Sequence, residues 1–282
     1  MGGMISSLHN SRVKDVVRLR DRRGRSRQAR ILIDGARELR RALDAGWQLT
    51  ELFVCTELAT SDDARATIKQ ASAAQDSTTD IWYVTQAVFE RLAFGDRADG
   101  VVGVASRAEP TLADLNPPLD SLIVVVEGVE KPGNLGAILR SADGAGVGAV
   151  ILCDGGTDWY NPNVIRASLG TVFTVPVASA STSETLDWLR RRGTRILAAR
   201  VEGAVRYWDV SWNGPVALVL GAEAAGLSDV WTGPDVAAVT LPMLGIADSL
   251  NVSATAAVLC YEALRQRSTG KGAGGDVVDS AG

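Results

Sequence analysis

Polar side chains that could carry out chemistry gather near the C-terminal end of the sequence, in LPMLGIADSLNVSATAAVLCYEAL from Leu241 to Leu264. A loop that contains Ser249 leads to Asn251 and then to a long run of small and apolar residues, which predicts a helix. Asp248 or Ser249 is expected to cap that helix, so backbone N–H groups should lie at the junction. The polar pair Ser249 and Asn251 is consistent with a binding site and equally with a capped core helix.

The predicted helix 251–264 is apolar on two faces. One face carries Leu250, Ala254, Val258, Tyr261 and Leu264, and another carries Ala256, Cys260 and Ala263. A helix of this kind is buried on most sides, either in the core or against a second subunit. We therefore expect a homodimer with its two-fold axis beside this helix.

Several common kinds of active site are excluded by composition. His9 is the only histidine, so a triad with a histidine base is not expected. Cys55, Cys153 and Cys260 are odd in number and widely spaced, and neither a disulfide framework nor a metal site is predicted. GAGVG at 144–148 precedes a strand, whereas a dinucleotide-binding fingerprint follows one. The chemistry is expected to use arginine, asparagine, serine, a carboxylate and backbone amides.

The elements that must position these groups are predicted to form two α/β domains. Residues 1–108 alternate short strands and helices, and EPTLADLNPP supplies a linker at 109–118. From 119 to 268 the apolar runs, such as SLIVVVEGV, are typical of strands buried on both faces of a parallel sheet. A site in such a domain is expected at the carboxyl edge of the sheet. Residues 269–282 are rich in Gly, Ser and Asp and are predicted to be disordered.

Charge is distributed unevenly along the chain. Its net charge is −4, yet the first 50 residues hold 12 basic against 5 acidic residues. The arginine-rich segment 12–30 predicts contacts with the phosphate backbone of RNA or DNA, from a flexible loop opened by Gly24 and Ser26; the alternative is a solvated helix. We expect Arg22, Arg23 and Arg25 to make such contacts. No apolar run approaches the ~20 residues of a membrane span and no signal sequence is recognised, so a cytoplasmic protein is expected.

Three stretches resemble, in order and spacing, the motifs of the SpoU (TrmH) family of RNA ribose 2′-O-methyltransferases. They are NLGAILR (134–140), LVLGAEAAGLS (218–228) and LPM…SLNVSATAA (241–257). The segment RASLGTVFTVPV and the N-terminal ILIDGARELRRALDAGWQLTELFVC are similar to the family too, so the resemblance spans about residues 25–266. It implies S-adenosylmethionine as methyl donor, a homodimer, and a knotted, SPOUT-type parallel-sheet domain behind a smaller RNA-binding domain.

The resemblance also implies roles for individual residues. Asn134 and Arg140 would position and activate the ribose and its phosphate, with Gly136 leaving the surface beside Arg140 uncrowded. The other interpretation of Arg140 is a surface ion pair with Asp143, three residues on. Glu223 is a further catalytic candidate, and the other interpretation is a solvent-exposed carboxylate of a turn.

Ser249 and Asn251 match the polar pair near the transferred methyl group, with helix capping as the competing role. Gly221, Leu241 and Leu250 match positions whose backbones hold the adenosine part of the donor. A guanidinium is a poor proton acceptor, so we expect Arg140 to orient the phosphate while the proton leaves to a phosphate, to Glu223 or to water.

The leading interpretation is an S-adenosylmethionine-dependent enzyme that methylates a ribose 2′-hydroxyl of structured RNA, with 23S ribosomal RNA ranked first. Resistance to a ribosome-targeting antibiotic is a role that the composition allows. The alternatives are a transfer RNA 2′-O-methyltransferase, a catalytically silent RNA-binding protein on the same fold, and a nucleotide-dependent α/β enzyme of another kind.

Overall fold

A computed structural model describes residues 3–73, 79–95, 98–202, 205–223 and 225–271. The chain forms two compact units, which we call the first unit and the second unit. The first unit comprises Met1–Pro110, Glu130–Arg140 and Thr157–Pro176, and the second comprises Thr111–Val129, Ser141–Gly156 and Val177–Gly282. The units do not follow a single boundary in the sequence, so the predicted linker at 109–118 stays a prediction.

The first unit is built on a five-stranded mixed sheet in the order β1-β4-β3-β5-β2. β4 pairs in parallel with β1 and β3, whereas β5 is antiparallel to both β3 and β2. Its strands are β1 (Met4–Ile5), β2 (Arg30–Asp34), β3 (Leu49–Val54), β4 (Asp80–Val84) and β5 (Val101–Ser106).

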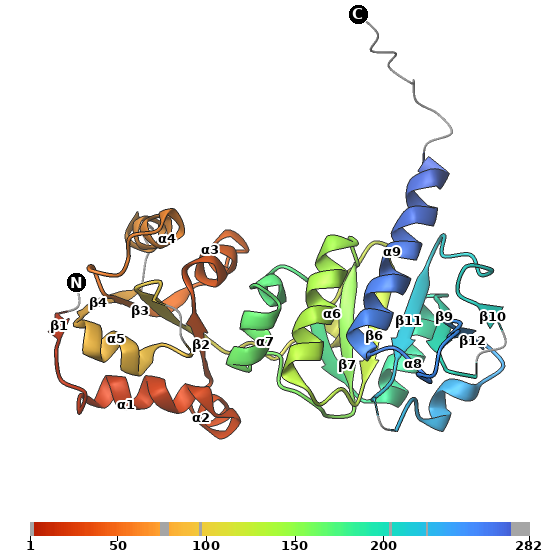
Figure 1. Cartoon of the computed structure of the whole chain (residues 1–282), viewed down its shortest axis with the longest axis horizontal. Helices are drawn as coiled ribbons and strands as arrows, with labels where there is room; N and C mark the ends of the chain where they lie inside the picture. The colour runs from red at the N-terminus through yellow and green to blue at the C-terminus, as the bar shows by residue number, and fades with distance from the viewer. Residues whose placement is uncertain (1–2, 74–78, 96–97, 203–204, 224, 272–282) are drawn as a thin grey trace, which may run out of the picture. The chain divides into compact units, whose positions relative to one another are not determined.

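Helices cover both faces of this sheet, with α3 and α4 above it and α1 and α5 below it in Figure 1. The lower face carries an apolar core in which Val16, Phe53, Phe89 and Val102 are buried. The helical elements of the first unit are α1 (Ser11–Val17), η1 (Arg18–Arg20), α2 (Arg22–Gln28), α3 (Ala36–Asp44), α4 (Asp62–Ala73), α5 (Gln86–Leu92), α7 (Pro162–Ala167) and η3 (Thr171–Phe173).

The second unit is built on a seven-stranded sheet in the order β10-β12-β9-β11-β6-β7-β8. All of its pairings are parallel, which agrees with the prediction from the continuous apolar runs. The strands are β6 (Leu122–Glu127), β7 (Ala149–Cys153), β8 (Val177–Ala180), β9 (Arg195–Ala199), β10 (Val205–Arg206), β11 (Val216–Leu220) and β12 (Val236–Thr240).

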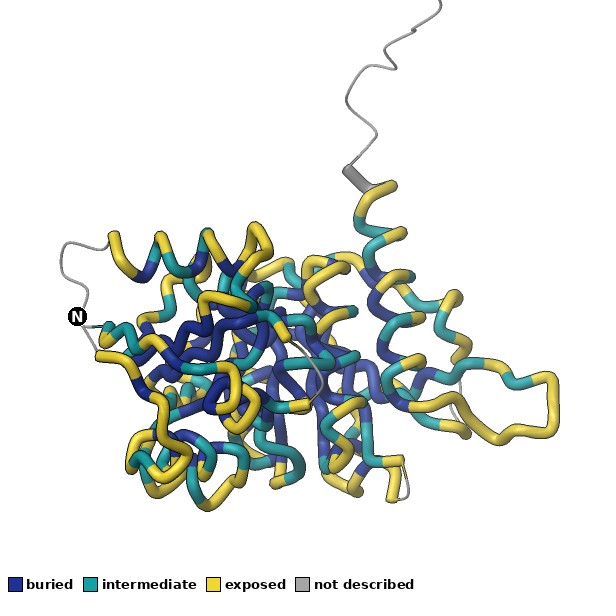
Figure 2. Tube along the Cα trace, turned by 60° about the vertical axis from the view of Figure 1, so that its left-hand side comes forward, coloured by how far each residue is buried: buried dark blue, intermediate teal, exposed yellow. Residues whose placement is uncertain are grey.

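Two long helices accompany this sheet, α8 (Thr182–Arg191) and α9 (Val252–Lys271). Leu186 and Leu189 of α8 pack into one core with side chains of β6, β7, β9 and β11. Ala256, Cys260 and Ala263 of α9 are buried, whereas Val258 and Tyr261 on its other apolar face remain exposed. The short elements are η2 (Leu112–Asp114) and η4 (Asp229–Thr232), and α6 (Pro132–Gly144) is divided between the two units. Strands β6, β7 and β11 are buried along their whole length, whereas β10 is exposed. Figure 2 shows buried segments in dark blue and exposed segments in yellow.

Two local predictions are wrong. Segment 12–30 is not opened into a loop by Gly24 and Ser26, because both lie inside α2. α9 extends to Lys271 into the predicted disordered tail, and the rest of that tail, 272–282, lies outside the described residues.

No helix within the described residues is long and apolar enough to cross a bilayer. The trefoil knot that the family resemblance implies stays a prediction.

Candidate functional site

A cavity of about 620 Å³ lies in the second unit, at the carboxyl ends of three adjacent strands. Its walls come from the segments that follow β9, β11 and β12 and from the beginning of α9. This is the edge at which open parallel sheets bind ligands, and the volume lies within the range of small-molecule sites. The predicted donor-binding residues Gly221, Leu241 and Leu250 all line it, as do Glu223, Ser249 and Asn251.

One wall is a tight loop that directly continues β11, and we call it the donor loop; its described residues are 221–223 and 225–228. Ala222 and Gly226 form a two-residue bridge, with N–H···O distances of 3.1 and 2.9 Å in the two directions. A Cβ at Gly221 would lie only 2.4 Å from the carbonyl carbon of Gly226, so a side chain there would force the loop open. Gly226 itself has a φ of +67°, which favours glycine. The glycines of this motif therefore give the loop its shape.

Glu223 and Asn251 contact each other at the N-terminal end of α9. The Asn251 amide donates to Glu223 Oε1 at 2.8 Å, while its oxygen accepts from the backbone N–H and the hydroxyl of Ser253 at 2.9 and 2.6 Å. Asn251 is therefore the N-cap of α9, and the prediction of Asp248 or Ser249 as the cap is wrong. Capping and a role in the site prove compatible, because the oxygen of the amide caps the helix while its nitrogen holds the carboxylate.

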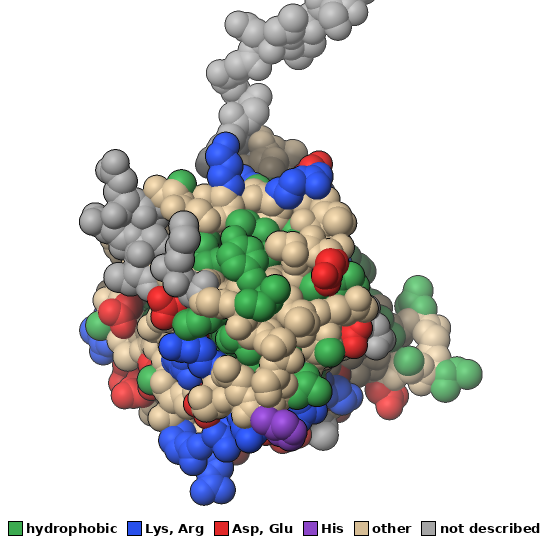
Figure 3. Space-filling model, turned by 90° about the vertical axis from the view of Figure 1, so that its left-hand side faces the viewer, with side chains coloured by type: hydrophobic (Ala, Val, Ile, Leu, Met, Phe, Trp, Pro, Cys, Tyr) green, Lys and Arg blue, Asp and Glu red, His purple; other side chains and the backbone are tan. Residues whose placement is uncertain are grey.

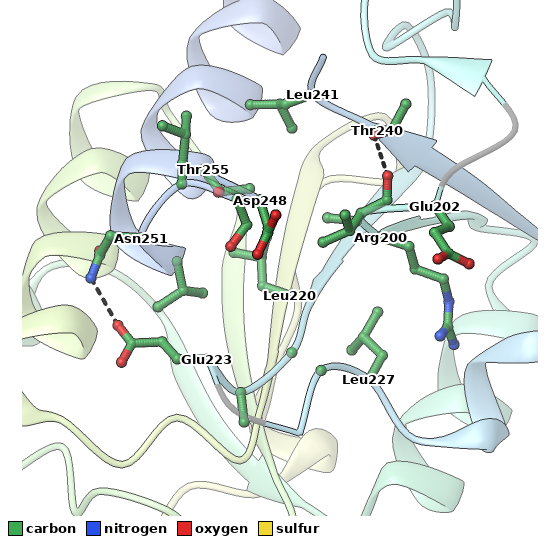
Figure 4. Close-up of a pocket in the computed structure, with 18 of the residues that line it drawn as sticks. Arg200, Glu202, Leu220, Glu223, Leu227, Thr240, Leu241, Asp248, Asn251 and Thr255 are labelled. Atoms are coloured by element: carbon green, nitrogen blue, oxygen red, sulfur yellow. Dashed lines mark hydrogen bonds between the residues drawn. The ribbon is translucent and has the colours of Figure 1, made fainter. Parts of the chain in front are cut away.

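Figure 4 shows how the polar groups divide around the cavity. Glu223 and Asn251 lie on one side, Arg200 and Glu202 on the other, and Asp248 between them. Arg200 and Glu202 were not among the predicted site residues. They follow β9 directly. Ligand sites lie at the carboxyl ends of parallel strands, and this rule, which indicated Gly221 at the end of β11, applies to the end of β9 as well. Arg200 donates to the carbonyls of Ser228 and Trp231 at 3.2 and 3.3 Å, which fixes the segment behind the donor loop.

The first-motif residues Asn134 and Arg140 lie on α6, in the part that belongs to the first unit, and are not among the residues that line the cavity. Arg140 is exposed. The prediction for Gly136 is wrong: it does not leave open surface, because a Cβ there would lie 2.5 Å from the Cβ of Ala167 and 2.8 Å from the amide of Ser168. Gly136 instead lets α6 pack against the end of α7.

Four of the eight arginines of the basic segment 12–30 bind other parts of the first unit. Arg12 pairs with Glu51 and stacks over Trp82, and Arg30 reaches the second oxygen of Glu51 at 2.9 Å. Arg20 donates to two backbone carbonyls at the C-terminal end of α5, those of Arg91 and Ala93, and burial lowers the pKa of its guanidinium. Arg22, Arg23 and Arg27 are exposed. Figure 3 shows basic side chains gathered on the lower part of one face of this unit.

Arg25 was expected to contact RNA, and that expectation is wrong. Its side chain is 1% exposed and forms an ion pair with Asp158, with Nη2···Oδ2 and Nε···Oδ2 distances of 2.8 and 2.9 Å. Nη1 donates to the carbonyls of Leu19 and Arg20 at 2.9 and 2.8 Å. Arg25 therefore joins α2 to the segment before α7, and no phosphate can reach it in this fold.

The cysteines are structural. Cys55, Cys153 and Cys260 are all free and buried. Burial raises the pKa of Cys153 and of Cys260 to about 12, so both are neutral thiols at physiological pH. Within the part of the chain that the structure describes, no group of three or more His, Cys, Asp or Glu side chains could hold a metal ion.

Two separate ranges of the sequence match known protein families. Residues 121–261 match the SpoU rRNA Methylase family, and residues 10–103 match the MRM3-like substrate binding domain. One similar curated protein is the 23S rRNA (uridine(2479)-2′-O)-methyltransferase of Streptomyces viridochromogenes. It is 31% identical over 262 residues, which are 90% of this chain and 88% of the relative.

Solved structures of the same kind are similar over nearly the whole chain. A crystal structure of an RNA 2′-O ribose methyltransferase is 41% identical, with a TM-score of 0.80, and the match covers 93% of this chain and 98% of that one. The AdoMet-bound rRNA methyltransferase from Sinorhizobium meliloti is 29% identical, with a TM-score of 0.84 and coverages of 93% and 97%.

Proposed function

The chain belongs to the SpoU rRNA methylase family, and we propose that it transfers the methyl group of S-adenosylmethionine to a ribose 2′-hydroxyl of 23S ribosomal RNA. The observation that carries this proposal is the cavity at the carboxyl edge, where all three predicted donor-binding residues meet Glu223, Ser249 and Asn251. A ribosomal RNA substrate would place the reaction in the cytoplasm.

The residues of the cavity fit the donor. Leu220, Leu227 and Leu241 offer apolar surface for an adenine ring, and Gly221 lines the same cavity. The bound donor supplies an activated methyl group on a sulfonium, so the chain needs to align and not to activate that group. Isothermal titration calorimetry of the chain with S-adenosylmethionine, in the presence of EDTA, should show saturable binding.

For the chemical step we propose distinct roles for the polar residues. Asn251 holds the Glu223 carboxylate at the cavity wall, where it can accept a proton directly or through water. Ser249 completes the polar side near the methyl group. Asn134 and Arg140 orient the ribose and its phosphate, and Arg140 adds electrostatic stabilisation of the developing oxyanion.

The role of Arg140 can be tested without disturbing the fold, because its side chain is exposed and alanine is the better helix former. Arg140→Ala should lower methyl transfer by about 100-fold or more, the scale seen when a preorganised electrostatic group is lost. Arg140→Lys should recover little, since an ammonium cannot reproduce the guanidinium fork. Near-normal turnover of Arg140→Ala would remove Arg140 from the site.

The RNA target is tested by mapping ribose methylation in cells with and without the gene, using mass spectrometry of nuclease fragments. We expect one 2′-O-methylated nucleotide of 23S RNA to disappear in the deletion strain. Loss of a methyl group from transfer RNA alone would favour the alternative substrate. A role in antibiotic resistance predicts that the deletion strain also becomes more sensitive to a drug that binds near that nucleotide.

We further propose that the chain works as a homodimer. Leu244 and Ile246, in the loop before α9, are fully exposed, and Val258 and Tyr261 on α9 are 37% and 51% exposed. Large apolar side chains exposed to this degree support a protein interface. Light scattering should give twice the monomer mass at micromolar concentration, and Tyr261→Glu together with Ile246→Glu should give a monomer. A wild-type monomer would contradict this proposal.

A further inference from the structure

The second unit contains a buried carboxylate, that of Glu127, which is bound to the end of the donor loop. Glu127 is the last residue of β6, it is only 7% exposed, and it does not line the cavity. Its Oε1 accepts from the hydroxyls of Thr182 and Ser228 at 2.8 and 2.7 Å, and its Oε2 accepts from the backbone N–H of Ser228 at 2.8 Å. Hydrogen bonds to an ionised, buried acceptor are among the strong ones, so this carboxylate is firmly bound.

Glu127 lies beside the first residue of the donor loop and accepts hydrogen bonds from the last. Leu220 of β11 pairs in register with Val126 of β6, so Gly221, the first residue of the loop, follows directly beside Glu127. Ser228 is the last residue of the loop, and Glu127 takes both of its donors. The loop closes on itself through Ala222 and Gly226, so fixing its two ends fixes the wall between them.

The other bonds of the loop do not replace this anchor. Asn251 holds the tip of the loop at Glu223, and Arg200 holds the carbonyl of Ser228. The N–H and the hydroxyl of Ser228 both point to Glu127 instead. Without the carboxylate, the N–H and the hydroxyl of Ser228 would both lose the acceptor that holds this end of the loop in place.

We propose that Glu127 is a positioning residue for methyl-donor binding: its carboxylate holds the donor loop in the shape that binds S-adenosylmethionine. This inference rests on the proposed function, because it takes the cavity to be the donor site. Glu127 acts through Ser228 and need not touch the donor.

Two variants separate positioning from a purely structural role. Ser228→Ala removes the hydroxyl that the donor loop gives to Oε1, and Thr182→Val removes the hydroxyl that α8 gives to the same oxygen. Both should lower the thermal unfolding midpoint by similar amounts. Only Ser228→Ala should weaken donor binding, by about tenfold if the binding-competent loop falls to about a tenth of the population.

The readouts are the Kd of S-adenosylmethionine from calorimetry and the split between KM and kcat. We expect Ser228→Ala to raise both the Kd and the KM for the donor and to keep kcat at saturating donor within about twofold, since a loop bound to the donor is already ordered. Thr182→Val should match the wild type in all three. Equal donor affinity in the two variants would overturn the proposal.

Substitutions of Glu127 itself test the hydrogen-bond basis. In Glu127→Gln the amide oxygen can accept from the Ser228 N–H, while the amide nitrogen donates to the two hydroxyls, which can also accept. Glu127→Gln should therefore bind the donor better than Glu127→Ala, and equal losses would overturn the assignment. If the wild-type chain itself fails to bind S-adenosylmethionine, the proposed function fails; if it binds and Ser228→Ala binds equally well, only the positioning role fails.

Discussion

Arg25→Ala should destabilise the first unit, although the arginine lies in a segment that reads as an RNA-binding arm. The substitution leaves the Asp158 carboxylate, only 5% exposed, without its cation. Breaking a buried pair in this way costs about 3–5 kcal/mol. Asp158 keeps one bond, from the backbone N–H of Tyr160 at 3.0 Å, so we expect the lower end of that range.

The assay is urea unfolding followed by tryptophan fluorescence, because Trp47 and Trp159 pack edge-on against Tyr160 beside the ion pair. With an m-value of about 3 kcal/mol per M, a loss of about 3 kcal/mol lowers the unfolding midpoint by about 1 M. Replacing both partners, Arg25→Met with Asp158→Leu, should recover most of that loss, since apolar residues of similar size often substitute for a buried pair.

The matched control is the pair Arg22→Ala and Arg23→Ala, whose side chains are exposed on the same helix. Each should change stability by no more than about 0.5 kcal/mol. If these arginines contact RNA phosphates, each substitution should also reduce the slope of log K against log salt by about one. An Arg25→Ala protein of wild-type stability with a flattened salt dependence would refute the structural assignment.

Two further predictions concern packing and thiol chemistry. Gly136→Ala should destabilise the chain by about 1–3 kcal/mol in urea unfolding, because the new methyl group meets the backbone after α7. The control is Gly133→Ala on the same helix, where the methyl group meets nothing within 4 Å and the change should be neutral or slightly stabilising. A neutral Gly136→Ala would contradict the close approach of α6 and α7. The native protein at pH 8 should react very slowly with a thiol reagent such as DTNB and rapidly in urea, because burial raises the pKa of all three thiols, those of Cys55, Cys153 and Cys260. Fast reaction in the native state would show that a cysteine is accessible.

The parallel sheet and its functional edge could be predicted because they depend on local patterns. Continuous apolar runs such as Leu122–Glu127 mark strands buried on both faces, and every such strand sends its carboxyl end to the same edge. The glycines of 221–226 indicated a turn at that edge, and the cavity formed there. The same reasoning applied to β9 would have added Arg200 and Glu202.

The fate of a charged side chain could not be predicted, because its partner is distant in the sequence. Arg25 meets Asp158 and Arg12 meets Glu51, and nothing near either arginine indicates that pairing. In the sequence Glu127 is only the polar end of an apolar strand, because its partner Ser228 lies 101 residues further on. Asp248, Ser249 and Asn251 are all good N-cap residues, so composition alone could not choose among them.

The most direct test of the proposed function is methyl transfer by the purified protein. The chain is incubated with S-adenosylmethionine labelled in its methyl group, EDTA, and 23S ribosomal RNA from cells that lack the gene, and the RNA is then digested to nucleosides. We expect label in a single 2′-O-methylnucleoside, approaching one methyl group per RNA, and no transfer to RNA from wild-type cells. Label in a base, or no label in RNA at all, would contradict the proposed function.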